Sequence, residues 1–343
     1  MKKSTLLPAL ALSAIAALSL SACTAEEAPA GGGGGGDAAT KTVWYADVMD
    51  SNPIAVAIAQ GMNETLAKND LKMVRSLAID TTTGNIDLGA QAQGLTRAIA
   101  TNPAAIAYFM LDASAARPQV EEAMGKDIPV FAAFGKPDFD VNGYIALYDE
   151  DQGYVSAKYL AEHLQKGDKV AILGGPATQN VLAEEKGATR ALEEAGLEIV
   201  GDVEQQRNLT DGAAGGKEVM QGILQQNPDI KGVWVYNDDS SMGAIAAAKQ
   251  AGVNVLFTSR NGTTDAIAAV KAGDLLGTCD IQPAKLGALL GQAIADQING
   301  TKTFTGSQQI DAPPADDCMV TKDNVADWKA PEELIKYAEI PLG

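Results

Sequence analysis

Short apolar runs alternate with amphipathic segments along the chain from Val43 onward. The runs are rich in β-branched and aromatic residues, which is typical of buried strands, and the segments between them have the apolar spacing of helices. In the first half the predicted strands are 43–48, 71–79, 104–110 and 128–134, and the predicted helices are 53–68, 87–101 and 115–125. This order predicts a doubly wound parallel sheet with right-handed crossovers.

The same alternation begins again after a short predicted strand at 144–147. The predicted helices of the second half are 153–165, 181–195, 212–227, 240–251, 264–272 and 285–299, and its predicted strands are 169–173, 198–203, 232–236, 254–258 and 275–281. A chain of 343 residues is also long enough for two domains of ordinary size. We therefore expect an α/β fold made of two doubly wound parallel-sheet lobes.

The N-terminus has the pattern of an export signal. A basic start, Met1–Lys3, precedes the apolar stretch Leu6–Leu20, which is shorter than the roughly 20 residues that a membrane span needs. The residues that follow, Leu20-Ser21-Ala22-Cys23, resemble the bacterial lipoprotein box, in which the cysteine is lipidated and the chain is cleaved before it. A single anchoring helix is the alternative. We expect residues 1–22 to be a lipoprotein signal peptide and Cys23 to carry a lipid anchor.

Residues 23–40 contain six consecutive glycines and no apolar periodicity, which predicts a flexible tether before the folded body. Lipidation of Cys23 would leave two of the three cysteines, Cys279 and Cys318, in a compartment that permits disulfides. We predict that these two form a disulfide. Two buried free thiols are the alternative, because cysteine is often simply a core residue.

Composition excludes several classes of function. With 26 Lys and Arg against 44 Asp and Glu, the net charge of −18 argues against a nucleic-acid partner. A single histidine, His163, excludes a histidine-rich metal site, and no nucleophile elbow is present. Acidic pairs such as Glu184-Glu185 fall within predicted helices and are interpreted as solvated faces. We therefore expect no catalysis, no cofactor and no metal.

Polar side chains follow the predicted strands, at the sheet edge where open α/β sheets bind ligands. Most of them are carboxylates and amides, which suit a neutral hydroxylated molecule better than proton transfer. Helix capping is the alternative role for Asn52, Asp112 and Asp238. The candidate residues at this edge are Asp47, Asn52, Asp112, Phe134, Asn237, Asp238, Arg260, Asn261 and Gln282.

Several short motifs, taken together in their order and spacing, resemble the periplasmic ribose- and galactose-type sugar-binding proteins, the solute receptors of ABC transporters. The motifs are Ser51-Asn52-Pro53, Asp127-Ile128-Pro129-Val130, Glu185-Lys186-Gly187, Tyr236-Asn237-Asp238-Asp239, Met242-Gly243-Ala244, Asn261-Gly262-Thr263, Asp280-Ile281-Gln282-Pro283 and Val320–Val325. The resemblance covers residues 42–327. It implies a type I periplasmic-binding-protein fold, in which a three-strand hinge joins the lobes and closes them on a ligand.

The resemblance also implies the limits of the lobes. Residues 41–147 with 283–308 would form the N-terminal lobe, and 148–282 with 309–343 the C-terminal lobe. The hinge crossovers would fall near 147–149, 281–283 and 307–311, close to Cys279 and Cys318.

Ligand-binding roles follow for particular residues of this chain. Asn52 would bond the ligand from the first lobe, Asn237 matches an asparagine ligand, and Gln282 matches a hinge glutamine. Lys186 stands where ribose binders have an arginine, and Asn261 replaces an aspartate.

Two departures from the family pattern bear on the ligand. Ile54-Ala55 stands where two phenylalanines are usual, and Phe134-Gly135 replaces an Asp-Arg pair. These changes argue against plain ribose as the ligand.

These observations together predict a lipid-anchored, extracytoplasmic solute-binding protein of an ABC importer. It would bind a sugar, polyol or similar small molecule as a monomer and present the closed form to a membrane permease. A receptor for a nucleoside or a sugar-like signal, coupled to a membrane sensor, is the alternative. A secreted enzyme is disfavoured because no catalytic constellation is visible.

Overall fold

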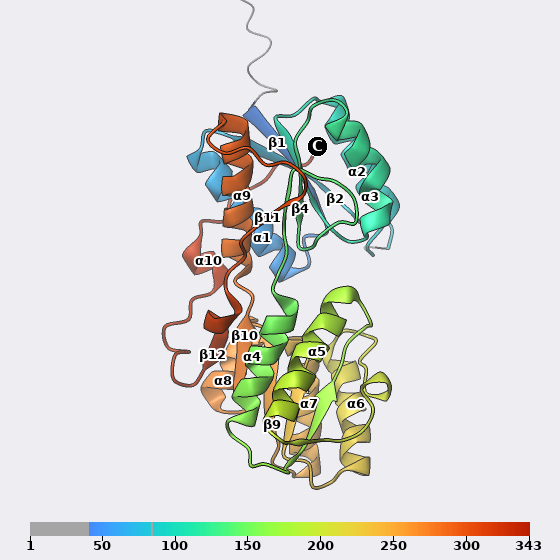
Figure 1. Ribbon diagram of the computed structural model, residues 1–343, viewed down its shortest axis with the longest axis vertical. Helices are drawn as coiled ribbons and strands as arrows, with labels where there is room; N and C mark the ends of the chain where they lie inside the picture. The colour runs from blue at the N-terminus through green and yellow to red at the C-terminus, as the bar shows by residue number, and fades with distance from the viewer. Residues whose placement is uncertain (1–40, 84) are drawn as a thin grey trace, which may run out of the picture. The chain divides into compact units, whose positions relative to one another are not determined.

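Two six-stranded sheets organise the part of the chain that the computed structural model describes, residues 41–83 and 85–343 (Figure 1). The first sheet has the order β11-β5-β4-β3-β1-β2, and all of its pairs are parallel. Its strands are β1 (Thr42–Asp47), β2 (Lys72–Leu77), β3 (Ala105–Phe109), β4 (Val130–Ala133), β5 (Gly143–Ile145) and β11 (Gln308–Ile310).

Helices cover both faces of this first sheet. They are α1 (Pro53–Lys68) and α9 (Pro283–Asn299) on one face, and α2 (Leu88–Ala100) and α3 (Ala113–Met124) on the other. In β1, Val43 and Tyr45 belong to the core formed with α1 and α9, whereas Trp44 and Ala46 belong to the core formed with α2 and α3. Since successive side chains of a strand point to opposite faces, a strand that is covered on both sides must be apolar throughout.

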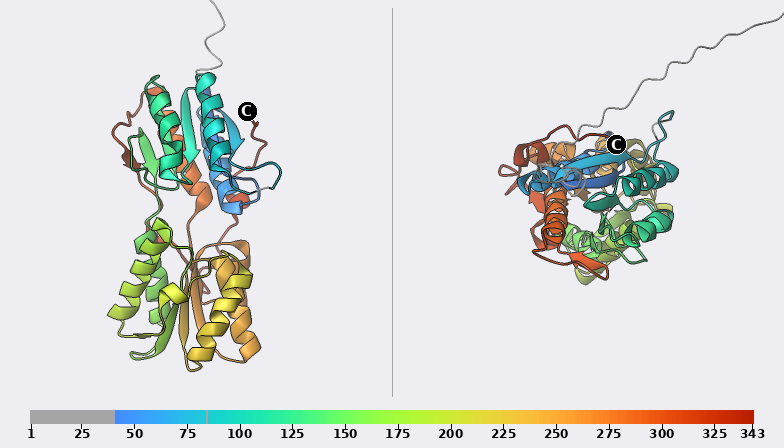
Figure 2. Two further views of the ribbon diagram at one scale, coloured as in Figure 1. Left: turned by 90° about the vertical axis from the view of Figure 1, so that its right-hand side faces the viewer. Right: turned by 90° about the horizontal axis from the view of Figure 1, so that it is seen from above.

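The second sheet repeats this plan with the order β12-β10-β9-β8-β6-β7, and only its edge strand β12 is antiparallel. Its strands are β6 (Lys169–Leu173), β7 (Glu198–Ile199), β8 (Gly232–Val235), β9 (Leu256–Asn261), β10 (Gly277–Asp280) and β12 (Met319–Thr321). Its helices are α4 (Asp149–Ala161), α5 (Gln179–Glu194), α6 (Ala213–Gln226), α7 (Asp238–Ala251) and α8 (Thr264–Ala272). The pairs α4–α5 and α6–α7 lie on opposite faces (Figure 2). The predicted two-lobe parallel α/β fold is confirmed.

The chain passes between the two sheets at residues 146–148, 281–282 and 311–318. The last of these segments leads to a disulfide between Cys279 in β10 and Cys318, which directly precedes β12. Both cysteines are buried, and the predicted pairing is confirmed. The bond fastens the antiparallel edge strand to the parallel sheet beside the crossing at 281–282.

The C-terminal tail differs from the sequence prediction, which placed all of 309–343 in the second lobe. Strand β11 pairs with β5 of the first sheet, and after α10 (Pro331–Leu334) the tail also returns to the first sheet. The Gln60 side chain donates to the Ala338 carbonyl (2.8 Å) and accepts from its N–H (2.9 Å). The Arg75 N–H of β2 donates to the Pro341 carbonyl (2.9 Å). The tail is too short to show an apolar periodicity. The sequence pattern therefore could not indicate which of the two sheets it packs against.

None of the helices within residues 41–83 and 85–343 combines the length and the hydropathy needed to cross a bilayer. The predicted signal peptide, the lipidated Cys23 and the tether 23–40 lie outside the described residues.

Replacing Cys279 and Cys318 with alanine is expected to lower the free energy of unfolding by about 3 kcal/mol, because the bond restricts the unfolded chain across a separation of 39 residues. Urea denaturation followed by circular dichroism measures the change. Wild-type protein in reducing agent is the matched control and should lose a similar amount. Unchanged urea midpoints in both samples would contradict the prediction.

Ile340 is the apolar anchor of the tail, with 5% of its surface exposed in the core between α1, α9 and the first sheet. Ile340→Ala is expected to cost about 2–4 kcal/mol of stability through lost burial and the cavity that remains. The neighbouring Leu342 is 63% exposed, so Leu342→Ala should change stability by less than about 0.5 kcal/mol. Equal effects of the two variants in the same urea titration would show that the tail does not pack as described.

Candidate functional site

A cavity of about 250 Å³ is lined by residues of both sheets, at the edges where their strands end and their helices begin. Cavities for drug-sized ligands usually exceed about 300 Å³, so this one suits a small solute. From the first lobe it is lined by Asn52, Ile54, Ala55, Phe109 and Phe134, and from the second by Pro176, Thr178, Asn180, Val181, Glu184, Asp211, Tyr236, Asn237, Arg260 and Asn261.

The wall from the first lobe is mainly apolar. The rings of Phe109 and Phe134 stack with their centroids 5.1 Å apart and an interplanar angle of 21°. Phe134 directly follows β4 and has φ = +67°, a conformation that bulky residues rarely adopt. This left-handed conformation ends the extended backbone of the strand. Asn52 caps α1, since its Oδ1 accepts from the N–H groups of Ile54 (2.9 Å) and Ala55 (3.1 Å). Stacked rings of this kind suit the C–H face of a small ring or chain.

The wall from the second lobe is polar, and one part of it is centred on Asp211. Its Oδ1 accepts hydrogen bonds from the Tyr236 hydroxyl and from Nδ2 of Asn237 (2.8 Å). Asn237 in turn caps α7 through the Ser240 N–H (2.9 Å). Burial and the carboxylate of Asp211 raise the pKa of Tyr236, which therefore remains a neutral phenol.

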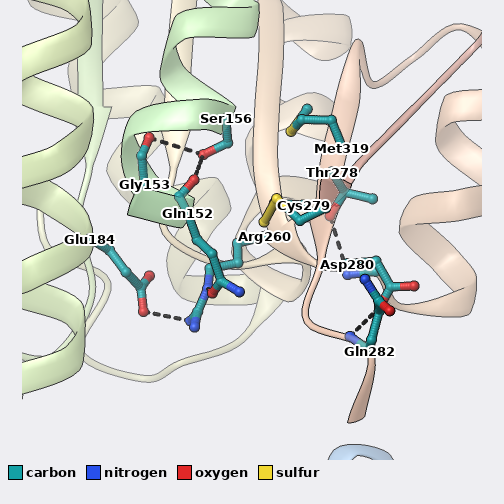
Figure 3. The surroundings of a disulfide bond; sticks show 12 residues. Gln152, Gly153, Ser156, Glu184, Arg260, Thr278, Cys279, Asp280, Gln282 and Met319 are labelled. Carbon is teal, nitrogen blue, oxygen red and sulfur yellow. Dashed lines mark hydrogen bonds and ion pairs between the residues drawn. A yellow bond between two sulfur atoms is a disulfide. The ribbon is translucent and has the colours of Figure 1, made fainter. Parts of the chain in front are cut away.

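The other part of the polar wall is a buried ionic cluster around Arg260 of β9 (Figure 3). Its guanidinium donates to Glu184 Oε1 (2.5 Å), to Asp149 Oδ1 (2.7 Å) and to Gln152 Oε1 (2.8 Å). Arg260 is 4% exposed and Glu184 is 1% exposed. A buried charge is tolerated only when it is paired. Through these three hydrogen bonds, Arg260 of β9 connects the first turn of α4 with the middle of α5.

Close helix packing fixes the position of Glu184. Helices α4 and α5 meet at two glycines, where an added Cβ would lie 2.1 Å from the Glu184 carbonyl oxygen at Gly153, and 1.9 Å from the Glu150 carbonyl oxygen at Gly187. No larger residue fits at either contact. The backbone of α5 therefore lies directly against the first turns of α4.

Burial raises the pKa of the acids in this region, although hydrogen bonds and Arg260 oppose the shift. Removal from water raises the pKa of Glu184, whereas the guanidinium of Arg260, bonded to its Oε1 at 2.5 Å, lowers it and favours the ionised carboxylate. Burial likewise raises the pKa of Asp149. In these buried surroundings a carboxylate interacts strongly with any polar group that reaches it.

The structure brings together five of the candidate edge residues: Asn52, Phe134, Asn237, Arg260 and Asn261 line one cavity. Asn52 has both of the roles considered for it, because it lines the cavity and also caps α1. Asp112 caps α3 through the Ala115 N–H (2.9 Å) and lies outside the lining.

The remaining predicted residues have other partners. Asp47 is buried and pairs with Arg75 (3.3 Å). Asp238 is buried, does not line the cavity, and accepts hydrogen bonds from Ser259, Thr278 and the Thr263 N–H. Lys186 is 72% exposed and pairs with Glu150 (2.8 Å), so it points to the opposite side of α5 from Glu184. Gln282, with φ = +50°, precedes α9 in the crossing and is not among the lining residues.

The interpretation of Glu184-Glu185 as a solvated helix face is wrong. Both side chains are buried, and Glu185 pairs with Arg207 (2.6 Å) as Glu184 does with Arg260. The partners lie 22 and 76 residues away, beyond the reach of any helical periodicity. The sequence signal for Glu184 was Arg260, because a charged residue in a buried strand requires a buried acid nearby.

Comparison with known proteins agrees with this architecture. A family model described as a periplasmic binding protein domain matches residues 48–302. The chain is 28% identical to a ribose import binding protein of Bacillus subtilis over 272 residues, which are 77% of this chain and 82% of that protein. It is also 28% identical to a xylitol-binding protein of Mycolicibacterium smegmatis over 324 residues, which are 92% and 86% of the two chains.

Solved structures share the fold. A periplasmic ribose ABC transporter protein of Conexibacter woesei superposes with a TM-score of 0.75 at 22% identity, covering 86% of this chain and 96% of the other. A solute-binding protein of Actinobacillus succinogenes with bound D-allose gives a TM-score of 0.72 at 25% identity, covering 84% and 99%. Because the family match spans most of the chain and the fold agrees with it, the chain belongs to the periplasmic binding protein family, whose members bind solutes for transport and are not enzymes.

Proposed function

We propose that this chain is the sugar-binding component of an ABC importer and that a small sugar or polyol binds in the cavity lined by both lobes. The observation that carries the proposal is the contrast between the two walls. Stacked Phe109 and Phe134 offer an apolar surface, while the opposite wall offers amides, carboxylates and a guanidinium. A polyhydroxylated molecule has both C–H groups and hydroxyls and can use both walls at once.

The relatives support this ligand class. Their names refer to ribose and to xylitol, and one structural neighbour holds D-allose. These ligands are small, uncharged and rich in hydroxyls. Departures at Ile54-Ala55 and Phe134-Gly135 favour a ligand other than plain ribose.

Ligand binding is proposed to close the lobes about the crossing segments. A ligand that touches both walls stabilises the arrangement in which they face each other, so its differential affinity drives the change. We place 41–147, 283–310 and 336–343 in the first lobe, and 148–282 with 311–335 in the second. The tail then makes a further connection between the lobes.

The proposed cellular setting is extracytoplasmic. Lipidation at Cys23 and the glycine-rich tether would hold a monomeric binding protein near its membrane permease, which would recognise the closed form. Mass spectrometry of the protein from membranes of the native host would detect the lipid on Cys23.

Ligand class is tested by thermal unfolding in the presence of D-ribose, D-allose and xylitol. A ligand at 100 times its Kd stabilises the folded state by about 2.7 kcal/mol, which corresponds to a rise in Tm of about 4 °C for a chain of this size. Sucrose, which exceeds the cavity, is the control at equal concentration. If no small sugar or polyol in an extended panel raises Tm above the sucrose control, the proposed function is wrong.

The site itself is tested by Asn237→Ala. Loss of this amide removes a lining group and releases Asp211, so ligand affinity is expected to fall about 10-fold or more by calorimetry. Asp87→Ala is the matched control, because Asp87 caps α2 and lies outside the cavity lining. Both variants should lose about 1 kcal/mol of stability as caps, but only Asn237→Ala should lose affinity. Equal affinities would place the ligand elsewhere.

A further inference from the structure

One oxygen of the ionic cluster has no partner. Glu184 Oε1 is bonded to Arg260, whereas Glu184 Oε2 is buried and has no hydrogen-bond partner within the described residues. In Figure 3 the second oxygen is directed away from the guanidinium. Buried polar atoms are nearly always bonded, so an unpaired carboxylate oxygen in a cavity wall indicates a partner supplied from the cavity.

Within the described residues, the Asn180 side chain, one turn earlier on α5, is the neighbouring amide that interacts with Glu184, but it makes no hydrogen bond to Oε2. Arg260 already divides its donors among Glu184, Asp149 and Gln152, and the close contact of α4 with α5 prevents the helix from shifting. Glu185, the next residue, is engaged by Arg207 on a different side of α5. The second oxygen is therefore fixed in place without a donor, as a preorganised binding group would be.

The charges of this wall restrict which donor can approach. The charged groups that line the cavity are the guanidinium of Arg260 and the carboxylates of Glu184 and Asp211, while Asp149 also pairs with Arg260 but does not line the cavity. Acceptors therefore outnumber cationic groups. A hydroxyl can donate to such a wall without adding charge, whereas an anionic ligand meets like charge in a partly desolvated cavity.

We propose that Glu184 determines the ligand specificity of this cavity: its Oε2 accepts a hydrogen bond from a hydroxyl of an uncharged sugar or polyol, and the acidic wall excludes uronates and sugar phosphates. This inference rests on the proposed function. It identifies as a ligand-binding residue an acid that the sequence pattern assigns to the surface.

The test is isothermal titration calorimetry of the wild-type chain and of Glu184→Gln with D-ribose, D-allose and xylitol. The amide oxygen of glutamine can still accept from Arg260, which turns the –NH2 group toward the ligand and replaces an acceptor with a donor. Affinity for the neutral ligands is expected to fall about 10- to 100-fold, the range for a hydrogen bond to a charged group. Glu185→Gln is the matched control, since it removes a neighbouring buried carboxylate that does not line the cavity, and its affinity should match the wild type.

Acidic ligands provide a second measurement that needs no variant. Wild-type protein is expected to bind D-glucuronate and D-ribose 5-phosphate at least 100-fold more weakly than the best neutral ligand, and Glu184→Gln should narrow this gap. An acidic sugar that binds the wild type as tightly as the neutral one overturns the proposal, even if Glu184→Gln does not fold.

The outcomes separate the two proposals. Neutral sugars that bind the wild type and bind Glu184→Gln equally well overturn the role of Glu184 and leave the proposed function standing. Tight binding of D-glucosamine in place of every neutral sugar also overturns it, because the unpaired oxygen would then serve a cationic ligand. A wild-type protein that binds no neutral sugar or polyol of the extended panel overturns the proposed function and this inference with it.

Discussion

The buried guanidinium of Arg260 is the constraint on which the ligand-facing side of the second lobe depends. It lies at the end of a strand with almost no exposure, and two carboxylates and an amide from α4 and α5 satisfy it. Removing one partner would leave an uncompensated charge in the interior, so the three elements are held as a unit. The position of the polar wall follows from that unit, and the glycine contacts between the two helices keep it rigid.

A second buried acid joins the strands and helices next to this wall. Asp238, at the start of α7, accepts hydrogen bonds from Ser259 of β9, Thr278 of β10 and the Thr263 N–H before α8. Its carboxylate thus joins two neighbouring strands and the starts of two helices at the carboxyl edge of the sheet. Burial raises its pKa to about 6, while these bonds limit the shift. Asp238 thus fixes the sheet edge that presents Asn237 and Asn261 to the cavity.

The disulfide and the tail constrain the opposite, C-terminal part of the chain. Cys318 ties the last strand of the second sheet beside the crossing at 281–282, and the tail then carries the chain back to β2 and α1 of the first sheet. The disulfide therefore fixes the segment before β12 to the second sheet, and the tail is held to the first lobe by hydrogen bonds and packing. Motion of one lobe against the other, as proposed for ligand binding, must be accommodated by short segments between these attachments.

The sequence alone was sufficient for the fold, for the disulfide and for part of the site. Doubly buried strands such as β1 are apolar throughout, and the alternation of strand and helix leaves few topologies open. Asn52, Phe134, Asn237 and Asn261 were predictable because each lies at the carboxyl end of a strand or in the turn after it, and the ends of parallel strands meet at one sheet edge.

Only the tertiary structure decided which of the other polar residues face the cavity. Glu184 and Lys186 are two positions apart on α5, yet one is buried against Arg260 and the other is exposed beside Glu150. Helical periodicity shows that the two residues lie on different faces of α5, but it does not show which face packs against a distant arginine. The pairing of Glu184 with a residue 76 positions away depends on how α5 packs against β9, and such long-range packing leaves no local pattern in the chain.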